Sequence, residues 1–163
     1  MVVPDPAMPG QESVWAYPRP AVAQSADHHL KIVHRGVILA ETRRGVRTLE
    51  TSHPPNYYFP RDDIAMDCLS ASSRSSVCEW KGRATYFHVA IAGDMLADVG
   101  WSYPVPTEDF RMLKDHVAFY AGPFEFCFVD GEKVVPQPGS FYGGWITSRV
   151  AGPFKGAPGS MFW

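Results

Sequence analysis

The sequence is poor in cysteine and charge and has no long apolar run. Its 163 residues contain three cysteines, Cys68, Cys78 and Cys127, which are widely spaced and form no C-x-x-C pair. We therefore predict reduced thiols rather than a disulfide framework or a structural zinc site. No segment approaches the roughly 18 apolar residues of a membrane helix, and the first residues carry no signal-peptide pattern. We expect a soluble cytoplasmic protein without a membrane partner.

Motifs that identify common cofactors are also missing. The net charge of −2 gives no electrostatic reason to expect nucleic acid as a partner. None of the six histidines stands in an H-x-x-x-H or H-E-x-x-H spacing, so no metal site is predicted. The string "GPFKGAPGS" at 152–160 lacks the G-K-[ST] of a phosphate loop, and no G-x-G-x-x-G or G-x-S-x-G occurs. The cofactor, if one exists, is left unknown.

What the sequence has in abundance is glycine, proline and aromatic residues. It contains 14 glycines and 15 prolines, and aromatic residues make up 13% of the chain. So many glycines and prolines argue against long helices, while the aromatic content is sufficient for a packed interior. The predicted fold is mainly β: a compact antiparallel sheet-on-sheet domain, tent-like or barrel-like, with one short helix near 107–115 and irregular wrapped arms.

Local patterns place the strands and turns. Arg35-Gly36 and Asp130-Gly131 each interrupt apolar runs and predict hairpins, and 46–51 reads as a further strand. "VCEWKG" and "ATYFHVAIAG" read as two strands that meet at Gly82. In the second, alternation places Thr85, Phe87, Val89 and Ile91 on one face, which we expect to be the core side. "TEDFRMLKDH" has Thr107 as a candidate N-cap and predicts the one helix.

Composition divides the chain into a core and arms. Residues 1–12 are rich in proline and predict a flexible lead, and 13–163 predict a single domain. Within it we expect a core at 29–132, an N-terminal arm at 13–28 and a C-terminal arm at 136–163. The C-terminal arm is rich in glycine, proline and aromatic residues, so it is expected to wrap the domain or a partner subunit rather than extend into water.

The pattern Trp-x-Tyr-Pro-x-Pro occurs twice, as "WAYPRP" at 15–20 and "WSYPVP" at 101–106. The sequences after the two copies diverge, which argues against duplication of a domain. Each proline pair favours an extended backbone on which Trp and Tyr act as hydrophobic anchors. The alternative is that Trp101 and Tyr103 help to sandwich a planar ligand.

Several strings together resemble one family. "SHPPNYYFPRDDI", "CEWKGRATY", "WSYPVP", "HVAFY" and "FYGGW…GPFKG" resemble the microbial family catalogued as domain of unknown function 427, in its long form with terminal extensions, over residues 12–163. The matching positions are Trp80, Lys81, Gly82, Ala84, Tyr86, Tyr103 and Pro104. The resemblance implies a small antiparallel β fold over about 29–132. A nucleotidyltransferase-like label attached to the family implies no catalytic residue on this chain.

The string "CEWKGRATY" is the strongest local candidate for a binding site. Trp80, Lys81 and Tyr86 surround a glycine where two strands meet, and an ammonium beside an indole suits an anionic or planar ligand. Strict strand alternation supports the structural alternative, in which Trp80 is core and Lys81 is exposed. Cys78 as a nucleophile would need a positive neighbour and a base.

The loop "SHPPNYYFPRDDI" offers a second set of candidates. His53 would be the acid or base if catalysis occurs, and Arg61 would hold an anion. The structural alternative is a short strand at 57–59 followed by a helical turn. Together the loop, the W-K-G strand pair and the Trp101/Tyr103 segment would form one site.

Three functional hypotheses remain open at this stage. The first is a protein that binds a small planar or anionic molecule in an aromatic and basic pocket; whether it is an enzyme is undecided. The second is a non-catalytic module that forms a homodimer through its aromatic C-terminal arm. Truncation at Pro136 is expected to distinguish it from the first. The third is a nucleotidyltransferase-like enzyme, for which no motif argues.

Overall fold

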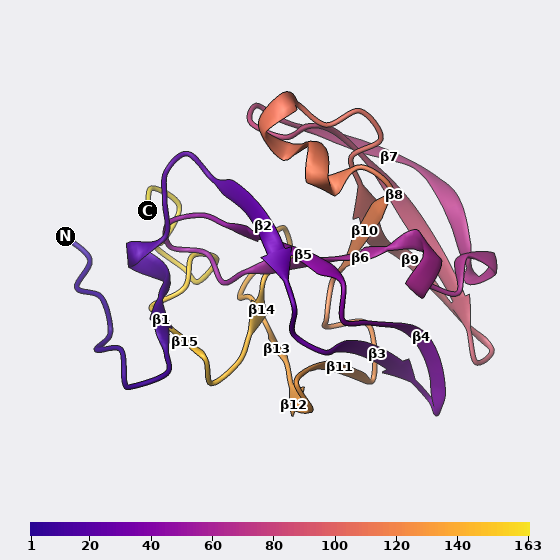
Figure 1. Ribbon diagram of the computed structural model, residues 1–163, viewed down its shortest axis with the longest axis horizontal. Helices are drawn as coiled ribbons and strands as arrows, with labels where there is room; N and C mark the ends of the chain where they lie inside the picture. Colours follow the sequence, from indigo (N-terminus) through magenta and orange to yellow (C-terminus); the bar gives the residue numbers. More distant parts are fainter.

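The computed structural model describes all 163 residues and is built almost entirely of β-strands joined by short turns (Figure 1). Its largest sheet has seven antiparallel strands in the order β2-β5-β6-β10-β9-β8-β7. These strands are Val22–Ala26 (β2), Gly45–Leu49 (β5), Asn56–Pro60 (β6), His116–Phe119 (β10), Asp94–Ser102 (β9), Gly82–Ile91 (β8) and Leu69–Cys78 (β7).

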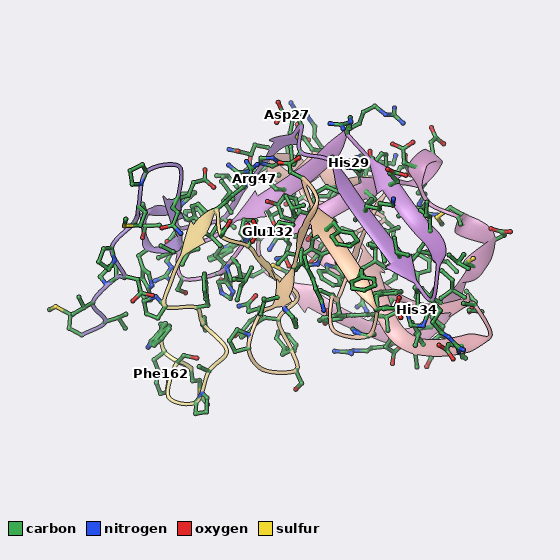
Figure 2. The ribbon with its side chains drawn as sticks, turned by 90° about the horizontal axis from the view of Figure 1, so that it is seen from below. Asp27, His29, His34, Arg47, Glu132 and Phe162 are labelled. Carbon is green, nitrogen blue, oxygen red and sulfur yellow. The ribbon has the colours of Figure 1, made fainter.

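A second, four-stranded sheet packs against one face of the first. Its order is β12-β11-β3-β4, with the strands Glu132–Lys133 (β12), Phe126–Val129 (β11), Leu30–His34 (β3) and Val37–Thr42 (β4). Figure 2 views the molecule from the side on which His29 and His34 mark the two ends of β3. The sheets do not close into a barrel, so the tent-like form of the prediction describes the fold better than the barrel-like one. The mainly β, antiparallel fold class is confirmed.

The two predicted hairpins are present, and their turn residues explain their register. Arg35 and Gly36 join β3 to β4 with φ of 48° and 82°, and Asp130 and Gly131 join β11 to β12 with φ of 51° and 80°. Positive φ at both central residues matches the right-handed twist of the flanking strands. These turns set the pairing of β3 with β4 and of β11 with β12 in the smaller sheet.

The predicted helix at 107–115 is shorter and tighter than expected. Residues Glu108–Leu113 (η4) form 3-10 turns with a kink at Phe110, and Thr107 makes no side-chain cap hydrogen bond. The hydroxyl of Thr107 instead donates to the carbonyl oxygen of Trp80. Phe110 and Leu113 are nevertheless buried. Three further 3-10 turns are Val14–Ala16 (η1), Arg61–Asp63 (η2) and Met66–Cys68 (η3), and no helical segment could cross a lipid bilayer.

Both faces of the seven-stranded sheet are covered, which corrects the expectation of a single core face on β8. Val89 and Ile91 pack into a cluster of 19 buried residues between the two sheets. Ala84 and Tyr86, on the opposite face of the same strand, belong to a second cluster of 10 buried residues. Periodicity alone cannot reveal this, because a strand covered on both faces has no polar side to mark it.

The two chain ends form arms that lie side by side (Figure 1). Glu12–Ser13 (β1) pairs in parallel with Val150–Ala151 (β15), and Val135–Pro136 (β13) pairs with Trp145–Ile146 (β14). Trp145 is fully buried within the first cluster, where its indole Nε1 donates to the carbonyl oxygen of Phe119 over 2.9 Å. By contrast, Phe162 is almost fully exposed on the last loop (Figure 2).

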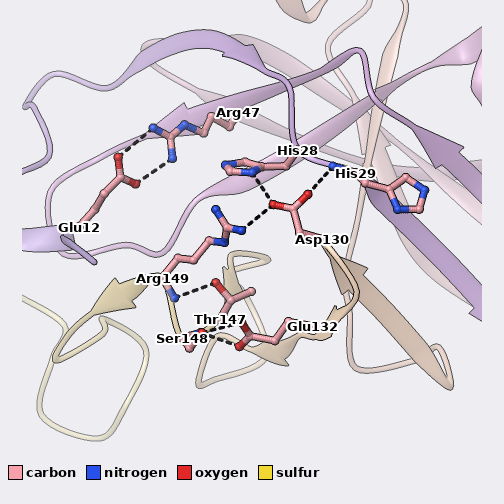
Figure 3. Close-up of polar contacts among 9 residues, drawn as sticks. All are labelled: Glu12, His28, His29, Arg47, Asp130, Glu132, Thr147, Ser148 and Arg149. Carbon is pink, nitrogen blue, oxygen red and sulfur yellow. Dashed lines mark hydrogen bonds and ion pairs between the residues drawn. The ribbon is translucent and has the colours of Figure 1, made fainter. Parts of the chain in front are cut away.

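Polar contacts fasten these arms to the β-strand core (Figure 3). Arg47 donates two hydrogen bonds to the carboxylate of Glu12, at 2.8 and 3.0 Å. Asp130 accepts from the backbone N–H of His29 at 2.8 Å and lies 2.7 Å from Nδ1 of His28 and 2.9 Å from the guanidinium of Arg149. The C-terminal arm is therefore held by both buried apolar contacts and ion pairs.

Candidate functional site

A cavity of about 310 Å³ opens on the face of the large sheet that the smaller sheet does not cover. Strands β6, β8 and β9, the turn between β7 and β8, and the C-terminal arm all contribute to it. Its lining residues are Glu50, His53, Asn56, Tyr58, Ser76, Val77, Cys78, Glu79, Trp80, Lys81, Tyr86, Trp101, Tyr103, Tyr120, Gln137, Phe141, Tyr142, Gly143 and Lys155. Six of the seven residues that the sequence nominated are in this set.

Lys81 is unusual among the cavity residues because its charged group is buried without a carboxylate partner. Its side chain is only 7% exposed, yet no carboxylate oxygen lies within 4.0 Å of its ammonium. The ammonium donates a long hydrogen bond to Sγ of Cys78 at 3.9 Å, and the centroid of the Phe110 ring lies 5.6 Å from it. Buried lysines are almost always paired, because removing an ammonium from water is costly.

The structural alternative, with Trp80 in the core and Lys81 exposed, is wrong for Lys81, which is buried, whereas Trp80 is partly buried and packs against the second cluster. Strand β7 ends at Cys78 and β8 begins at Gly82, so residues 79–81 form a turn in which strand alternation does not apply. Trp80 is half-buried, and the backbone carbonyl of Lys81 accepts a hydrogen bond from the N–H of Thr107 at 3.1 Å. The segment before η4 therefore holds the turn against the sheet.

Gly82 is required at the end of this turn. Its φ of 110° is one that other residues rarely adopt, and a Cβ there would lie 3.1 Å from the carbonyl oxygen of Val105. Any larger residue would separate the turn from residues 105–107 and displace Lys81 with it.

Aromatic side chains form the walls around Trp101. Its ring centroid lies 4.8 Å from that of Tyr120 and 6.3 Å from that of Tyr58, and Tyr58 lies 6.5 Å from Tyr103. Burial raises the pKa of Tyr58 and of Tyr103 far above the usual range, so both phenols stay protonated. The hydroxyl of Tyr86 is within 2.9 Å of Ser76 Oγ. These rings provide flat apolar surfaces with neutral polar tips.

His53 is buried and neutral at physiological pH. Burial, together with the nearby charges of Lys155, Lys81 and Arg19, lowers its pKa to about 4. The amide nitrogen of Gln137 lies 3.0 Å from Nδ1, which must accept because an amide nitrogen donates. The proton therefore sits on Nε2, 3.5 Å from Glu50 Oε2. With both ring nitrogens engaged, His53 is better placed to shape the cavity than to accept a proton.

Gln137 joins this histidine to the C-terminal arm. Its amide nitrogen also donates to the carbonyl oxygen of Lys155 at 2.8 Å, and its amide oxygen accepts from the N–H of Gly144 at 3.0 Å. At Gly143 the backbone passes so close to Trp101 that a Cβ would lie 2.3 Å from the indole Cη2. The arm thus forms one wall of the cavity.

Because the C-terminal arm forms a wall of the cavity, truncation at Pro136 is not the test that the sequence suggested. Such a truncation would remove Trp145 from the buried core as well as five lining residues, which are Gln137, Phe141, Tyr142, Gly143 and Lys155. It cannot separate a ligand-binding protein from a dimeric module, because it would damage both. Point substitutions in the cavity are needed instead.

Arg61 is the nominated residue that lies elsewhere. It begins η2 beyond the end of β6, where its guanidinium is 5.7 Å from the ring centroid of Phe87 on β8. It does not line the cavity, so it is not available as the anion clamp that the loop composition suggested.

Sequence reasoning missed the lining residues that are remote from the nominated motifs. Gln137, Tyr142 and Lys155 belong to the irregular C-terminal arm, whereas Tyr58 lies within the candidate loop "SHPPNYYFPRDDI" itself. No local pattern marks such residues, since tertiary contacts alone bring them to the cavity. The pairing of β6 with β10 and β10 with β9 is what places Tyr58 beside Trp101.

Comparisons with known proteins place the β-strand core in a family. No curated protein matches the chain. A family model described as a domain of unknown function (DUF427) matches residues 22–130, which include β2 through β11 and exclude the C-terminal arm. Because that match spans two thirds of the sequence, the chain belongs to the DUF427 family.

Proposed function

We propose that this protein binds a small, planar, anionic molecule in the cavity between the large sheet and the C-terminal arm. The observation that carries the proposal is the buried ammonium of Lys81, which has no carboxylate partner and lines an aromatic cavity. A ligand carboxylate or phosphate would supply the missing counter-charge, and its ring system would lie against Trp101 and Tyr103.

The two carboxylates of the cavity do not neutralise Lys81. Glu79 is exposed at the turn, and Glu50 faces Nε2 of His53 at 3.5 Å. The phenols of Tyr58 and Tyr103 stay neutral, so no phenolate competes for the ammonium. The local field at Lys81 therefore favours an anion from outside the chain.

The size of the cavity limits the ligand. Its volume of about 310 Å³ is at the small end of the range of roughly 300–1,000 Å³ that ligand pockets span. A molecule with one or two fused rings and a single acidic group suits this space. Aromatic carboxylates are the simplest compounds that meet all three requirements of shape, size and charge.

Thermal unfolding and calorimetric titration with matched ligands test the proposal. The probes are benzoate, indole-3-carboxylate and orotate, each beside the corresponding neutral amide. A ligand at about 100 times its Kd stabilises the folded state by roughly 2.7 kcal/mol, which raises Tm by a few degrees. We expect stabilisation by an acid and not by its amide, and loss of that stabilisation in Lys81→Met.

The matched control is Lys114→Met, which removes the same charge from an exposed position. Equal binding of acid and amide, or binding that survives Lys81→Met, would count against the proposal. The same library includes nucleoside triphosphates with magnesium, because turnover of one of them would favour the nucleotidyltransferase alternative.

A further inference from the structure

Cys78 is a thiol inside the proposed binding cavity. It is the last residue of β7, is half-buried, and lines the cavity together with Lys81. Its Sγ atom lies 3.9 Å from the ammonium of Lys81. A thiolate is the nucleophilic form of cysteine, and a neighbouring ammonium stabilises it.

The other two thiols have environments that oppose this chemistry. Burial raises the pKa of Cys127 to about 12, and burial followed by the charge of Asp67 raises the pKa of Cys68. Neither lines the cavity. The three cysteines thus provide an internal comparison, in which Cys78 alone combines a cation with access to a pocket.

An independent observation links this thiol to a ligand. Lys81 is more than nine-tenths buried without a carboxylate partner, so the space beside Cys78 already attracts an anion. An anionic molecule held by Lys81 would have its nearest atoms within reach of Sγ. The cavity therefore favours electrophiles that carry an acidic group over neutral ones.

From this geometry we infer that Cys78 is a nucleophile that forms a covalent adduct with a planar α,β-unsaturated carbonyl compound bearing a carboxylate. The inference rests on the anion site of the proposed function. Sγ forms a bond to the β-carbon while the carbon–carbon π pair moves through the carbonyl to its oxygen. The proton lost by the thiol then returns at the α-carbon, so the addition needs no further reactant.

Alkylation with two small probes tests the inference. Iodoacetate and iodoacetamide differ in charge but react by the same step. In both, Sγ displaces iodide, which leaves with the electron pair of the carbon–iodine bond, and the thiol proton passes to the buffer. Peptide mass spectrometry follows each cysteine over time in the folded and the denatured protein. We expect Cys78 to react first, with an iodoacetate-to-iodoacetamide rate ratio about tenfold above that of the denatured chain, because the ammonium of Lys81 attracts the carboxylate of iodoacetate.

Substitutions of Lys81 and Lys114 test whether the charge of Lys81 causes the reactivity of Cys78. Lys81→Met should return the rate ratio at Cys78 to the denatured value, whereas Lys114→Met should leave it unchanged. Bound benzoate should protect Cys78 from both probes. Because Lys81→Met retains the length of the side chain and removes only the charge, a folded variant is expected, and its far-ultraviolet circular dichroism verifies this.

Two results would overturn the inference. One is a Cys78 that reacts no faster than it does in the denatured chain; the other is a rate ratio that Lys81→Met does not alter. Benzoate binding measured by calorimetry on the wild-type protein separates this failure from that of the proposed function. If benzoate still binds while Cys78 is unreactive, the pocket stands and only the nucleophile is rejected.

Discussion

The two faces of the seven-stranded sheet are built from the same strands but differ in how their side chains pack. On β6, Phe59 points into the apolar core between the sheets, and Tyr58 points to the opposite face. On β10, Val117 and Phe119 enter the core, and Ala118 lies on the other side. The core side is filled, whereas the opposite side holds a cavity of about 310 Å³.

The difference teaches how one sheet can carry a filled apolar core on one face and an open cavity on the other. Apolar side chains that interlock leave no space and contribute most of the burial free energy. Tyrosine and tryptophan leave polar tips and flat surfaces, and the small residue Ala118 leaves room beside them. Substitutions on the two faces should therefore have different consequences, which the following experiments compare.

The largest expected effect is on the filled face. Phe59 is fully buried, with its ring centroid 6.0 Å from those of Phe119 and Trp145. Phe59→Ala should lower the free energy of unfolding by about 3–5 kcal/mol, because the aromatic side chain is lost and a cavity remains. Urea unfolding measures this loss. A cost below that of Tyr103→Phe would refute the division between the faces.

The next effect is a pH dependence that arises on the cavity face. The folded pKa of His53, about 4, is below its ordinary value of 6.5, so the unfolded chain binds more protons between these values. Stability should thus be complete above pH 6.5, decrease as the pH falls toward 4, and lose about 3 kcal/mol in total from this group. Urea unfolding of the wild type and of His53→Gln across this range should show a shallower slope in the variant; identical slopes would contradict the assignment.

A smaller effect of opposite sign is expected at Lys81. Lys81→Met replaces a buried, unpaired charge with an apolar side chain of similar length, so we expect the free energy of unfolding to stay the same or rise by about 1 kcal/mol. The same substitution should abolish binding of an aromatic acid. Chemical unfolding and calorimetry on one preparation check both; a marked destabilisation would mean that Lys81 has a structural role.

The smallest effect on stability is expected from Tyr103→Phe. The ring that packs beside Tyr58 is retained and only the hydroxyl is removed, so the change in unfolding free energy should not exceed about 1 kcal/mol, the net contribution of one hydrogen bond. Ligand affinity, in contrast, should change if the hydroxyl touches the bound molecule. Differential scanning calorimetry with and without benzoate compares the two, and Tyr17→Phe on the N-terminal arm serves as a tyrosine control outside the cavity.

Much of the local structure followed from the sequence. The Arg35-Gly36 and Asp130-Gly131 turns, the alternating strands and the absence of long helices were predictable, because they depend on the conformational preferences of a few adjacent residues. The W-K-G string and the second Trp-x-Tyr-Pro segment also pointed to residues that the structure brings into one cavity.

Tertiary structure alone decided the burial of Lys81 and the composition of the cavity. A turn replaced the strand alternation at 79–81, and contacts with Thr107, far along the chain, hold that turn in place. Gln137 and Lys155 reach the site because buried Trp145 and the polar contacts of the arm hold the C-terminal segment against the core. The sequence by itself determined the fold class and the turns, which are set by local backbone preferences. The packing of distant segments determined the site, because burial and charge pairing depend on neighbours that no local pattern records.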